Sequence, residues 1–297
     1  MPVAHDTPDL PRPGDRGPGD RGITNGRCAI AVMAKAPRTG QVKTRLVPPL
    51  THDAAAALSA SFLRDITQNI LLAARQQAIQ GYIAYAPAGF ERLFEGVIAS
   101  GTRLVLADGS GEMPPGVQGF GRSLLQASEA LFEKGHETVC LLNSDSPSLP
   151  TSLLCQAAEA LTRDGDRVVL GPADDGGYYV IGMKAPHAHL FEDIDWSTDR
   201  VACQTRARAR SLGLELVELA TWYDVDDRSG LARLLDEFAD PASTADGVTP
   251  YGAPATAACI EHLGLRQLLG LERFLPPLDK TRRPVRAAPM SPASVAR

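Results

Sequence analysis

The sequence lacks the features of secreted disulfide scaffolds and of membrane proteins. It has only five cysteines in 297 residues, spaced far apart and without a CxxC pair. We therefore expect them to be small core residues in a reducing compartment. No uninterrupted apolar stretch approaches the ~20 residues that cross a bilayer. The first residues carry proline, glycine and mixed charge in place of an apolar signal region, so we expect a cytoplasmic protein without a membrane span.

Several catalytic signatures are also absent. The chain has no HxxxH, no GxSxG and no Cys/His pairing with metal spacing, which disfavours zinc chemistry and hydrolytic triads. Residues 35–46, KAPRTGQVKTRL, match neither a Walker A loop nor a GxGxxG fingerprint. With a net charge of -5, it lacks the overall basic charge of a protein that coats nucleic acid. Its composition, 44% hydrophobic and 22% charged, is that of an ordinary globular protein and its length allows a self-sufficient enzyme.

Composition divides the chain into a core, a shorter segment and two tails. Residues 1–26 are rich in proline and glycine, and residues 279–297 are basic with little apolar content, so we expect both tails to be disordered. Strand-like and helical patterns alternate over residues 27–240, which predicts one catalytic domain. Residues 241–278 contain leucines at helical spacing and predict an appended helical segment.

The alternation within the core predicts an α/β fold with a mostly parallel central sheet and helices on both faces. Thr51, followed by Asp53, is expected to open the first helix. The expected strands are 28–34, 81–87, 102–107, 137–143, 167–172, 178–183 and 214–220. The stretch ADDGG between the fifth and sixth of these predicts a hairpin. The main later helices are expected at 123–135, 150–165 and 227–238.

A basic loop follows the first expected strand. Between residues 21 and 52 there are six Lys or Arg residues and no Asp or Glu, in a chain that is acidic overall. Four of them lie in KAPRTGQVKTRL: Lys35, Arg38, Lys43 and Arg45. Loops at the carboxyl ends of parallel strands form the ligand crevice of such sheets, so these cations predict a nucleotide-phosphate site. The alternative interpretation is a solvated basic loop without a ligand.

Two acidic motifs follow later strands. Asp145 in NSDSP ends an apolar strand and is the first candidate to hold Mg²⁺ or Mn²⁺ against phosphate oxygens, unless it caps a turn or helix. In DVDD, Asp224 or Asp226 is the candidate second ligand. Asp226 or Asp227 could equally be the N-cap of the last core helix.

The segment PADDGGYY combines a turn signal with adjacent glycines. Gly176 and Gly177 would let a substrate approach the backbone closely, and would leave Asp174 and Asp175 to face it. Trp196, in the following WST segment, is expected to be a core or lid aromatic rather than a stacking platform.

Taken together, these motifs resemble those of one bacterial family. KAPRTGQVKTRL, GFGRSLL, NSDSP, GPADDGGYY, WST and DVDDRSGL are similar in order and spacing to the DUF2064 family, over about residues 28–238. Proteins of that family resemble GT-A-fold nucleotide-diphospho-sugar transferases and include radical-SAM/selenodomain-associated transferases. The chain departs from the family in having Asn143-Ser144-Asp145 where Gly-Ala-Asp is more usual, and in its extension after Pro241.

The resemblance assigns roles to individual residues. It implies that Lys35, Arg38, Lys43 and Arg45, with Arg122 of GFGRSLL, bind the nucleotide phosphates. It places Asp145 on the metal-binding motif. By similarity to sugar-nucleotide uridylyltransferases, it favours Asp226 over Asp224 as the second metal ligand.

The resemblance also implies a reaction. A metal-dependent glycosyltransferase would move a sugar from a nucleotide-diphospho-sugar to a small acceptor, with Lys43 and Asp145 neutralising charge and Asp175 accepting the acceptor's proton. The KTRL element is also similar to that of phospholactate guanylyltransferases, so guanylyl or uridylyl transfer to a small phosphorylated substrate is the alternative. A catalytically idle nucleotide-binding module is the second alternative.

Overall fold

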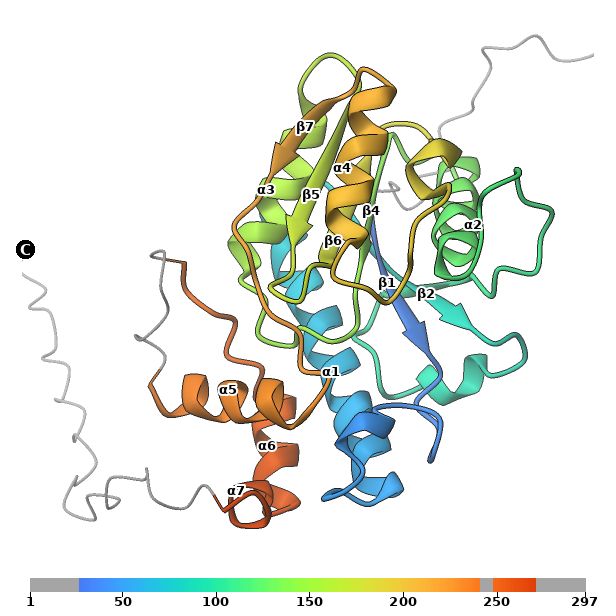
Figure 1. Cartoon of the computed structure of the whole chain (residues 1–297). Helices are drawn as coiled ribbons and strands as arrows, with labels where there is room; N and C mark the ends of the chain where they lie inside the picture. Colours follow the sequence, from blue (N-terminus) through green and yellow to red (C-terminus); the bar gives the residue numbers. More distant parts are fainter. Residues whose placement is uncertain (1–26, 241–247, 271–297) are drawn as a thin grey trace, which may run out of the picture.

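A seven-stranded sheet lies at the centre of residues 27–240 and 248–270, the part of the chain that the computed structural model describes (Figure 1). The expected tails, residues 1–26 and 279–297, lie outside it. The strand order is β3-β2-β1-β4-β6-β5-β7. The strands are β1 (Cys28–Lys35), β2 (Ile79–Ala86), β3 (Arg103–Leu106), β4 (Thr138–Leu142), β5 (Arg167–Pro172), β6 (Tyr178–Met183) and β7 (Glu215–Glu218).

The sheet is parallel except around β6. β1 pairs in parallel with β2 and β4, whereas β6 is antiparallel to both β4 and β5. The expected hairpin over ADDGG is therefore confirmed, since it joins β5 to β6. β1 is buried from Cys28 to Ala34, as befits a central strand covered on both faces.

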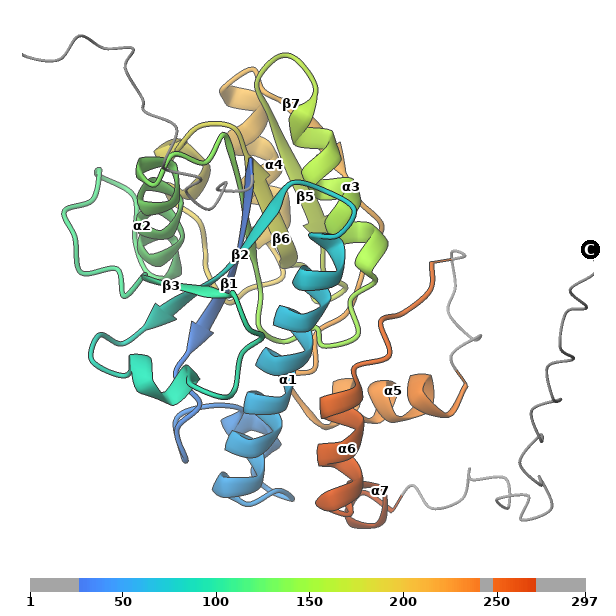
Figure 2. The same ribbon diagram turned by 180° about the vertical axis from the view of Figure 1, so that it is seen from behind.

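Helices cover both faces of the sheet, as predicted. One apolar core lies under α1 (His52–Ala73) and α3 (Thr151–Thr162), which stand in front of the sheet in Figure 2. The other core lies under α2 (Phe120–Glu133), η3 (Ala188–Phe191) and α4 (Val201–Ser211). Thr51 caps α1 as predicted, since its hydroxyl accepts a hydrogen bond from Ala54 N at 3.1 Å.

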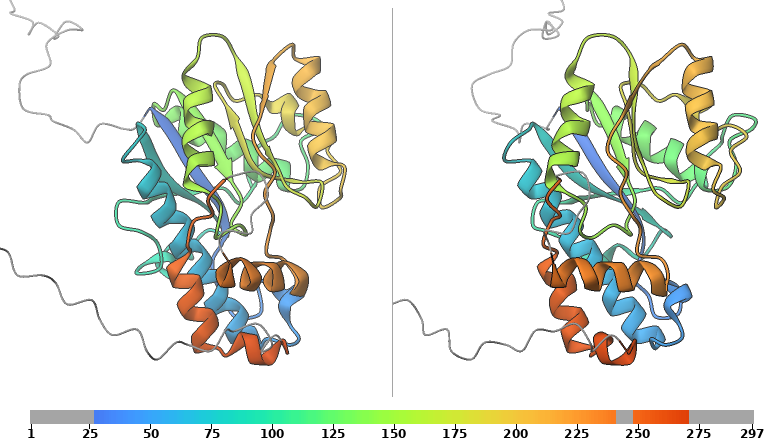
Figure 3. Two further views of the ribbon diagram at one scale, coloured as in Figure 1. Left: turned by 90° about the vertical axis from the view of Figure 1, so that its left-hand side faces the viewer. Right: turned by 60° about the vertical axis from the view of Figure 1, so that its left-hand side comes forward.

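The last helices gather beside the beginning of α1. α5 (Arg228–Ala239), α6 (Pro254–His262) and α7 (Leu265–Leu268) lie at the lower end of both views in Figure 3. The leucine pattern predicted an appended helical segment over residues 241–278, of which the structure describes residues 248–270. Within these residues Gly264, with a φ of 61°, separates α6 from α7. None of the helices in the described ranges is long and apolar enough to cross a membrane.

Candidate active site

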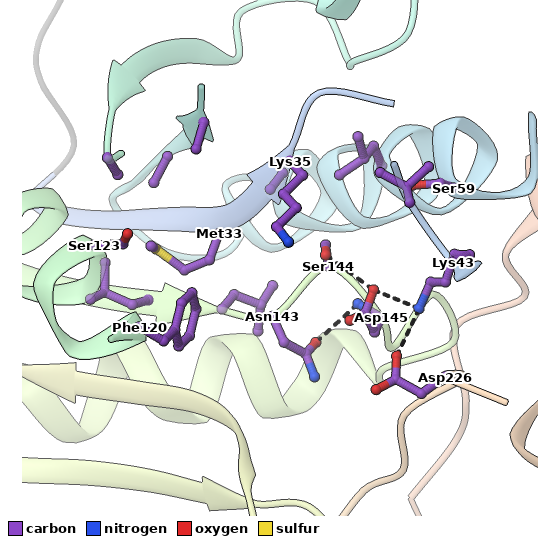
Figure 4. A pocket seen from close by; sticks show the side chains of 18 of the residues that line it. Met33, Lys35, Lys43, Ser59, Phe120, Ser123, Asn143, Ser144, Asp145 and Asp226 are labelled. Carbon is purple, nitrogen blue, oxygen red and sulfur yellow. Dashed lines mark hydrogen bonds and ion pairs between the residues drawn. The ribbon is translucent and has the colours of Figure 1, made fainter. Parts of the chain in front are cut away.

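The basic loop after β1 is anchored by three apolar side chains. Val42, Leu46 and Leu50 are at most 8% exposed, which fixes the loop against the core. The short helix η1 (Thr44–Leu46) follows Lys43, whose φ of 49° lies in the left-handed region that few non-glycine residues adopt. In this conformation the Lys43 side chain points toward Asp145 (Figure 4).

The loop borders a cavity of about 430 Å³ at the carboxyl edge of the sheet. The ends of β1 and β4, helix α1 and the beginning of α2 supply its walls (Figure 4). Among the described residues, the charged side chains that line it are Lys35, Lys43, Arg45, Asp145 and Asp226. The structure thus brings three of the predicted phosphate ligands and both predicted metal ligands to one cavity.

Two carboxylates converge on the ammonium group of Lys43. Lys43 Nζ lies 2.7 Å from Asp145 Oδ1 and 3.0 Å from Asp226 Oδ1, and it donates to Val225 O at 2.8 Å. The Lys43 side chain is only 5% exposed. Burial opposes the charged form, but the attraction of Asp145 and Asp226 outweighs it, so the Lys43 pKa is raised. Lys43 is therefore a fixed positive charge in the wall of the cavity.

The carboxylate pair has the oxygen chemistry that a hard divalent cation prefers. Burial and the neighbouring charge of Asp145 raise the pKa of Asp226, although Lys43 and Arg45 oppose this shift. Mg²⁺ is commonly held by one or two carboxylates together with water and phosphate oxygens. In this structure both carboxylates face the Lys43 ammonium.

The protein alone supplies few ligands for a metal. Within residues 27–240 and 248–270 there is no group of three or more His, Cys, Asp or Glu side chains that could hold a metal ion. A cation at Asp145 and Asp226 would therefore take its remaining ligands from water or from a bound phosphate.

Asp224 ties together the loops that carry the two carboxylates. Its Oδ1 accepts hydrogen bonds from Asn143 Nδ2 at 2.5 Å and from Ser146 Oγ at 2.7 Å. Burial raises the Asp224 pKa to about 7; the hydrogen bond from Ser146 opposes this shift, and the nearby charge of Asp145 adds to it. Asp224 is not part of the cavity wall. It braces the NSDSP loop, while Asp226 faces the cavity.

Asp227 is the helix cap of the acidic motif. Its Oδ1 accepts hydrogen bonds from Ser229 N at 2.9 Å and from Gly230 N at 3.0 Å, at the beginning of α5. The sequence predicted that Asp226 or Asp227 caps this helix, and the cap is Asp227.

Arg38 and Arg122 are not part of the cavity wall. The Arg38 guanidinium lies 4.1 Å from the centre of the Phe90 ring. The Arg122 guanidinium donates to Gly109 O at 2.8 Å and to Gly111 O at 2.7 Å. Both arginines brace neighbouring loops in this structure, so nothing in it supports the phosphate-binding role predicted for them.

The ADDGG turn packs against the protein rather than lining the cavity. Asp174 forms an ion pair with an arginine of α5, and Asp175 Oδ1 accepts from Gly177 N at 2.8 Å. Gly176 has a φ of 90°, and a Cβ there would lie 2.2 Å from Asp199 O. The sequence predicted that a substrate would approach the backbone at these glycines. In the structure, the chain's own loop around WST lies against Gly176.

The sequence motifs did not indicate the apolar end of the cavity. Met33 at the end of β1 and Phe120 and Ser123 at the start of α2 line it. The signal for this end is in GFGRSLL, where two glycines flank Phe120.

A family model matches the part of the chain that holds four of the six motifs, whereas KAPRTGQVKTRL and DVDDRSGL lie outside the matched residues. Residues 70–198 match the model of a family described as "Uncharacterized protein conserved in bacteria (DUF2064)". The resemblance to DUF2064 is confirmed. No curated protein matches the chain.

Several solved structures are similar to this chain, one of them with a TM-score above 0.5. A protein of Desulfovibrio desulfuricans G20, described as a candidate nucleotide-diphospho-sugar transferase, is 26% identical with a TM-score of 0.64 over 82% of this chain and 98% of that chain. A CMP:2-keto-3-deoxy-manno-octonic acid synthetase in complex with CTP is 10% identical, with a TM-score of 0.45 over 71% and 98%. A cytidylyltransferase of Leptospira borgpetersenii is 10% identical, with a TM-score of 0.44 over 84% and 99%. The predicted fold class, a mostly parallel sheet of the nucleotide-diphospho-sugar transferase type, is confirmed by the first of these and by the sheet itself.

Proposed function

We propose that the protein is a metal-dependent transferase that uses a nucleotide-diphospho-sugar as donor. The observation that carries this proposal is the convergence of Asp145 and Asp226 on one cation position, beside Lys35 and Arg45 in the same cavity. A diphosphate with a divalent cation has the charges to engage both groups at once. The shared fold of the D. desulfuricans protein supports a sugar nucleotide as the source of that diphosphate.

The roles of the residues follow from their chemistry. Lys35, Lys43 and Arg45 bind the diphosphate oxygens, and Arg45 can do so with two parallel hydrogen bonds. Asp145 and Asp226 hold Mg²⁺ or Mn²⁺, which when bound would neutralise charge on the departing diphosphate. The cavity of about 430 Å³ is within the ~300–1,000 Å³ range of sites that enclose small molecules.

Nucleotidyl transfer to a small phosphorylated substrate is the second candidate. Sugar transfer to a hydroxyl needs a proton acceptor, for which Asp175 is proposed, although it is not part of the cavity wall. Attack by a substrate phosphate on the α-phosphate needs no side-chain base. Asp145 and Asp226 are the only carboxylates in the described part of the cavity wall, and both are assigned to the metal. The wall therefore offers no further carboxylate as a base, which supports this second candidate.

The leaving group distinguishes the two reactions. The protein is incubated with Mg²⁺ and either nucleotide sugars or nucleoside triphosphates, and the products are separated by anion-exchange chromatography. Slow transfer of a sugar to water releases a nucleoside diphosphate, whereas nucleotidyl transfer releases pyrophosphate. We expect nucleoside diphosphate, released by the wild type and not by Asp145→Asn. Release of pyrophosphate alone would establish the second candidate, and failure of both donor classes to bind or react would refute the proposal.

A further inference from the structure

Phe120 is a large apolar side chain at the cavity that the proposed phosphate and metal chemistry does not use. It is the first residue of α2, it lines the cavity, and it is 48% exposed. Figure 4 shows its ring beside Met33 and Asn143, at the end of the cavity away from Lys43. An exposed ring on a cavity wall offers a ligand an apolar surface from which water can be displaced.

Trp196 supports this ring. The Phe120 and Trp196 rings are 5.7 Å apart and meet edge to face at 85°. Trp196 itself is half-buried and packs against the core under α2. The loop that carries it has two non-glycine residues in the left-handed region, Asp193 with a φ of 48° and Ser197 with a φ of 64°. Such conformations are uncommon, so the loop is held in a defined shape around Trp196.

The glycines on either side of Phe120 make room for the indole. A Cβ at Gly121 would lie 2.9 Å from Trp196 Cζ2 and 3.1 Å from Phe191 O. A Cβ at Gly119, whose φ is 53°, would lie 3.2 Å from Trp196 Cδ1. A side chain at either position would displace Trp196. The GFG of α2 and the tryptophan of WST, distant in the sequence, therefore form one unit whose effect is to hold Phe120 at the cavity.

The position of Phe120 relative to the charged groups indicates what it contacts. Along the cavity, Figure 4 shows Phe120, then Asn143, then Asp145, and finally Lys43. Phosphates held at the charged end would direct the rest of the same ligand toward Phe120. We infer that Phe120, supported by Trp196, is a stacking surface for a ring of the nucleotide-sugar ligand, either the base or the sugar. This inference rests on the proposed function.

Binding measurements with and without a ring test this inference. Calorimetric titrations in Mg²⁺ compare pyrophosphate, which has no ring, with the common nucleoside triphosphates and their nucleotide sugars. Phe120→Ala should weaken the binding of ring-bearing ligands about tenfold, because a stacking side chain is lost. Pyrophosphate affinity should stay within about twofold, since its contacts are ionic. Phe120→Tyr keeps a ring and should bind as the wild type does. Leu212→Ala, at an exposed apolar residue outside the cavity wall, is the matched control and should change nothing.

The outcomes separate this inference from the proposed function. Weaker binding of triphosphates assigns Phe120 to the base, and weaker binding of nucleotide sugars alone assigns it to the sugar ring. Unchanged affinity for every ring-bearing ligand, or an equal loss for pyrophosphate, overturns the stacking role while the proposed function stands. A wild type that binds none of these ligands refutes both.

A second readout does not depend on Phe120 variants folding. The chain has two tryptophans, Trp196 and Trp222, so Trp222→Phe leaves Trp196 as the only indole fluorophore. A ring that reaches Phe120 should change Trp196 emission, whereas pyrophosphate should not. Identical spectra with and without a bound ring-bearing ligand would contradict the inference.

Discussion

Lys43 contacts both carboxylates of the cavity wall. Its ammonium has three acceptors, two of them carboxylate oxygens that the proposed metal would also require. Binding of a metal nucleotide would let Lys43 exchange these partners for phosphate oxygens. In the proposed function, the same side chain would stabilise the site before the ligand binds and would then contact its phosphates.

Replacing Lys43 with methionine should have opposite effects on two ligands. Pyrophosphate binding should weaken about ten- to a hundredfold, because one charge-assisted contact is lost. Mn²⁺ alone should bind more tightly than to the wild type, because no ammonium then competes for Asp145 and Asp226. Titration calorimetry measures both affinities. Equal pyrophosphate affinity in the wild type and the variant would show that Lys43 is only structural.

Asp224 should make stability depend on pH. Its folded-state pKa of about 7 lies above its ordinary value of 3.8. The folded state therefore binds the proton more tightly, and the stability that this provides is complete below pH ~4 and lost as the pH rises through 7. Asp224→Asn keeps an acceptor oxygen without the charge, so its Tm relative to the wild type should rise between pH 5 and pH 8. A difference in Tm that stays constant over this range would contradict the assignment.

The sequence predicted that charged side chains would lie at this edge of the sheet. It did not predict where every one of these side chains would point. Lys43, Asp145 and Asp226 meet because their loops follow strands whose ends lie at one edge of the sheet, which the alternating pattern predicts. The direction of a long side chain depends on its neighbours. Arg38 lies over Phe90, and Arg122 reaches the loop around Gly109, neither of which the sequence could indicate.

At the scale of elements, the helices that bury leucine were predicted and α4 was not. α4 buries Val201, Ala202, Thr205 and Ala209, and its remaining residues include three arginines. Small buried side chains give little apolar periodicity, so the pattern that identifies a half-buried helix is weak there. In leucine-rich helices such as α3, the apolar periodicity is clear.

A buried carboxylate supports the contact between α1 and α6. Asp65 on α1 is 1% exposed and accepts from Ala255 N at 3.0 Å and Thr256 N at 2.6 Å. It caps α6 from outside that helix. Burial raises its pKa, and the hydrogen bonds at Thr256 oppose this shift.

Asp65→Ala should therefore destabilise the protein by about 1–3 kcal/mol, because it leaves buried backbone donors at the start of α6 without an acceptor. Asp65→Asn retains one acceptor oxygen and should cost less. Urea denaturation of both variants measures the free energies of unfolding. A free energy of unfolding for Asp65→Ala equal to that of the wild type would show that this cap contributes nothing to stability.

At the scale of the whole molecule, the sheet brings residues from both ends of the core to one edge. β1 leads into the basic loop, β4 leads into NSDSP, and the chain returns past β7 to place Asp226 between them. The sequence predicted this α/β order and the hairpin. It could not show that Asp224 braces the site or that Gly176 packs against Asp199, because both contacts join segments distant in the chain.

The central claim is that Asp145 and Asp226 bind a divalent cation together with a nucleotide diphosphate. Its most direct test is calorimetric titration with nucleoside diphosphates, with and without Mn²⁺, of the wild type, Asp145→Asn, Asp226→Asn and the capping variant Asp227→Asn. Mn²⁺ should strengthen binding of the preferred diphosphate to the wild type and to Asp227→Asn, since their carboxylate pair is intact. In Asp145→Asn and Asp226→Asn, this strengthening should be lost while the proteins remain folded. Undiminished strengthening by Mn²⁺ in both of these variants would contradict the claim.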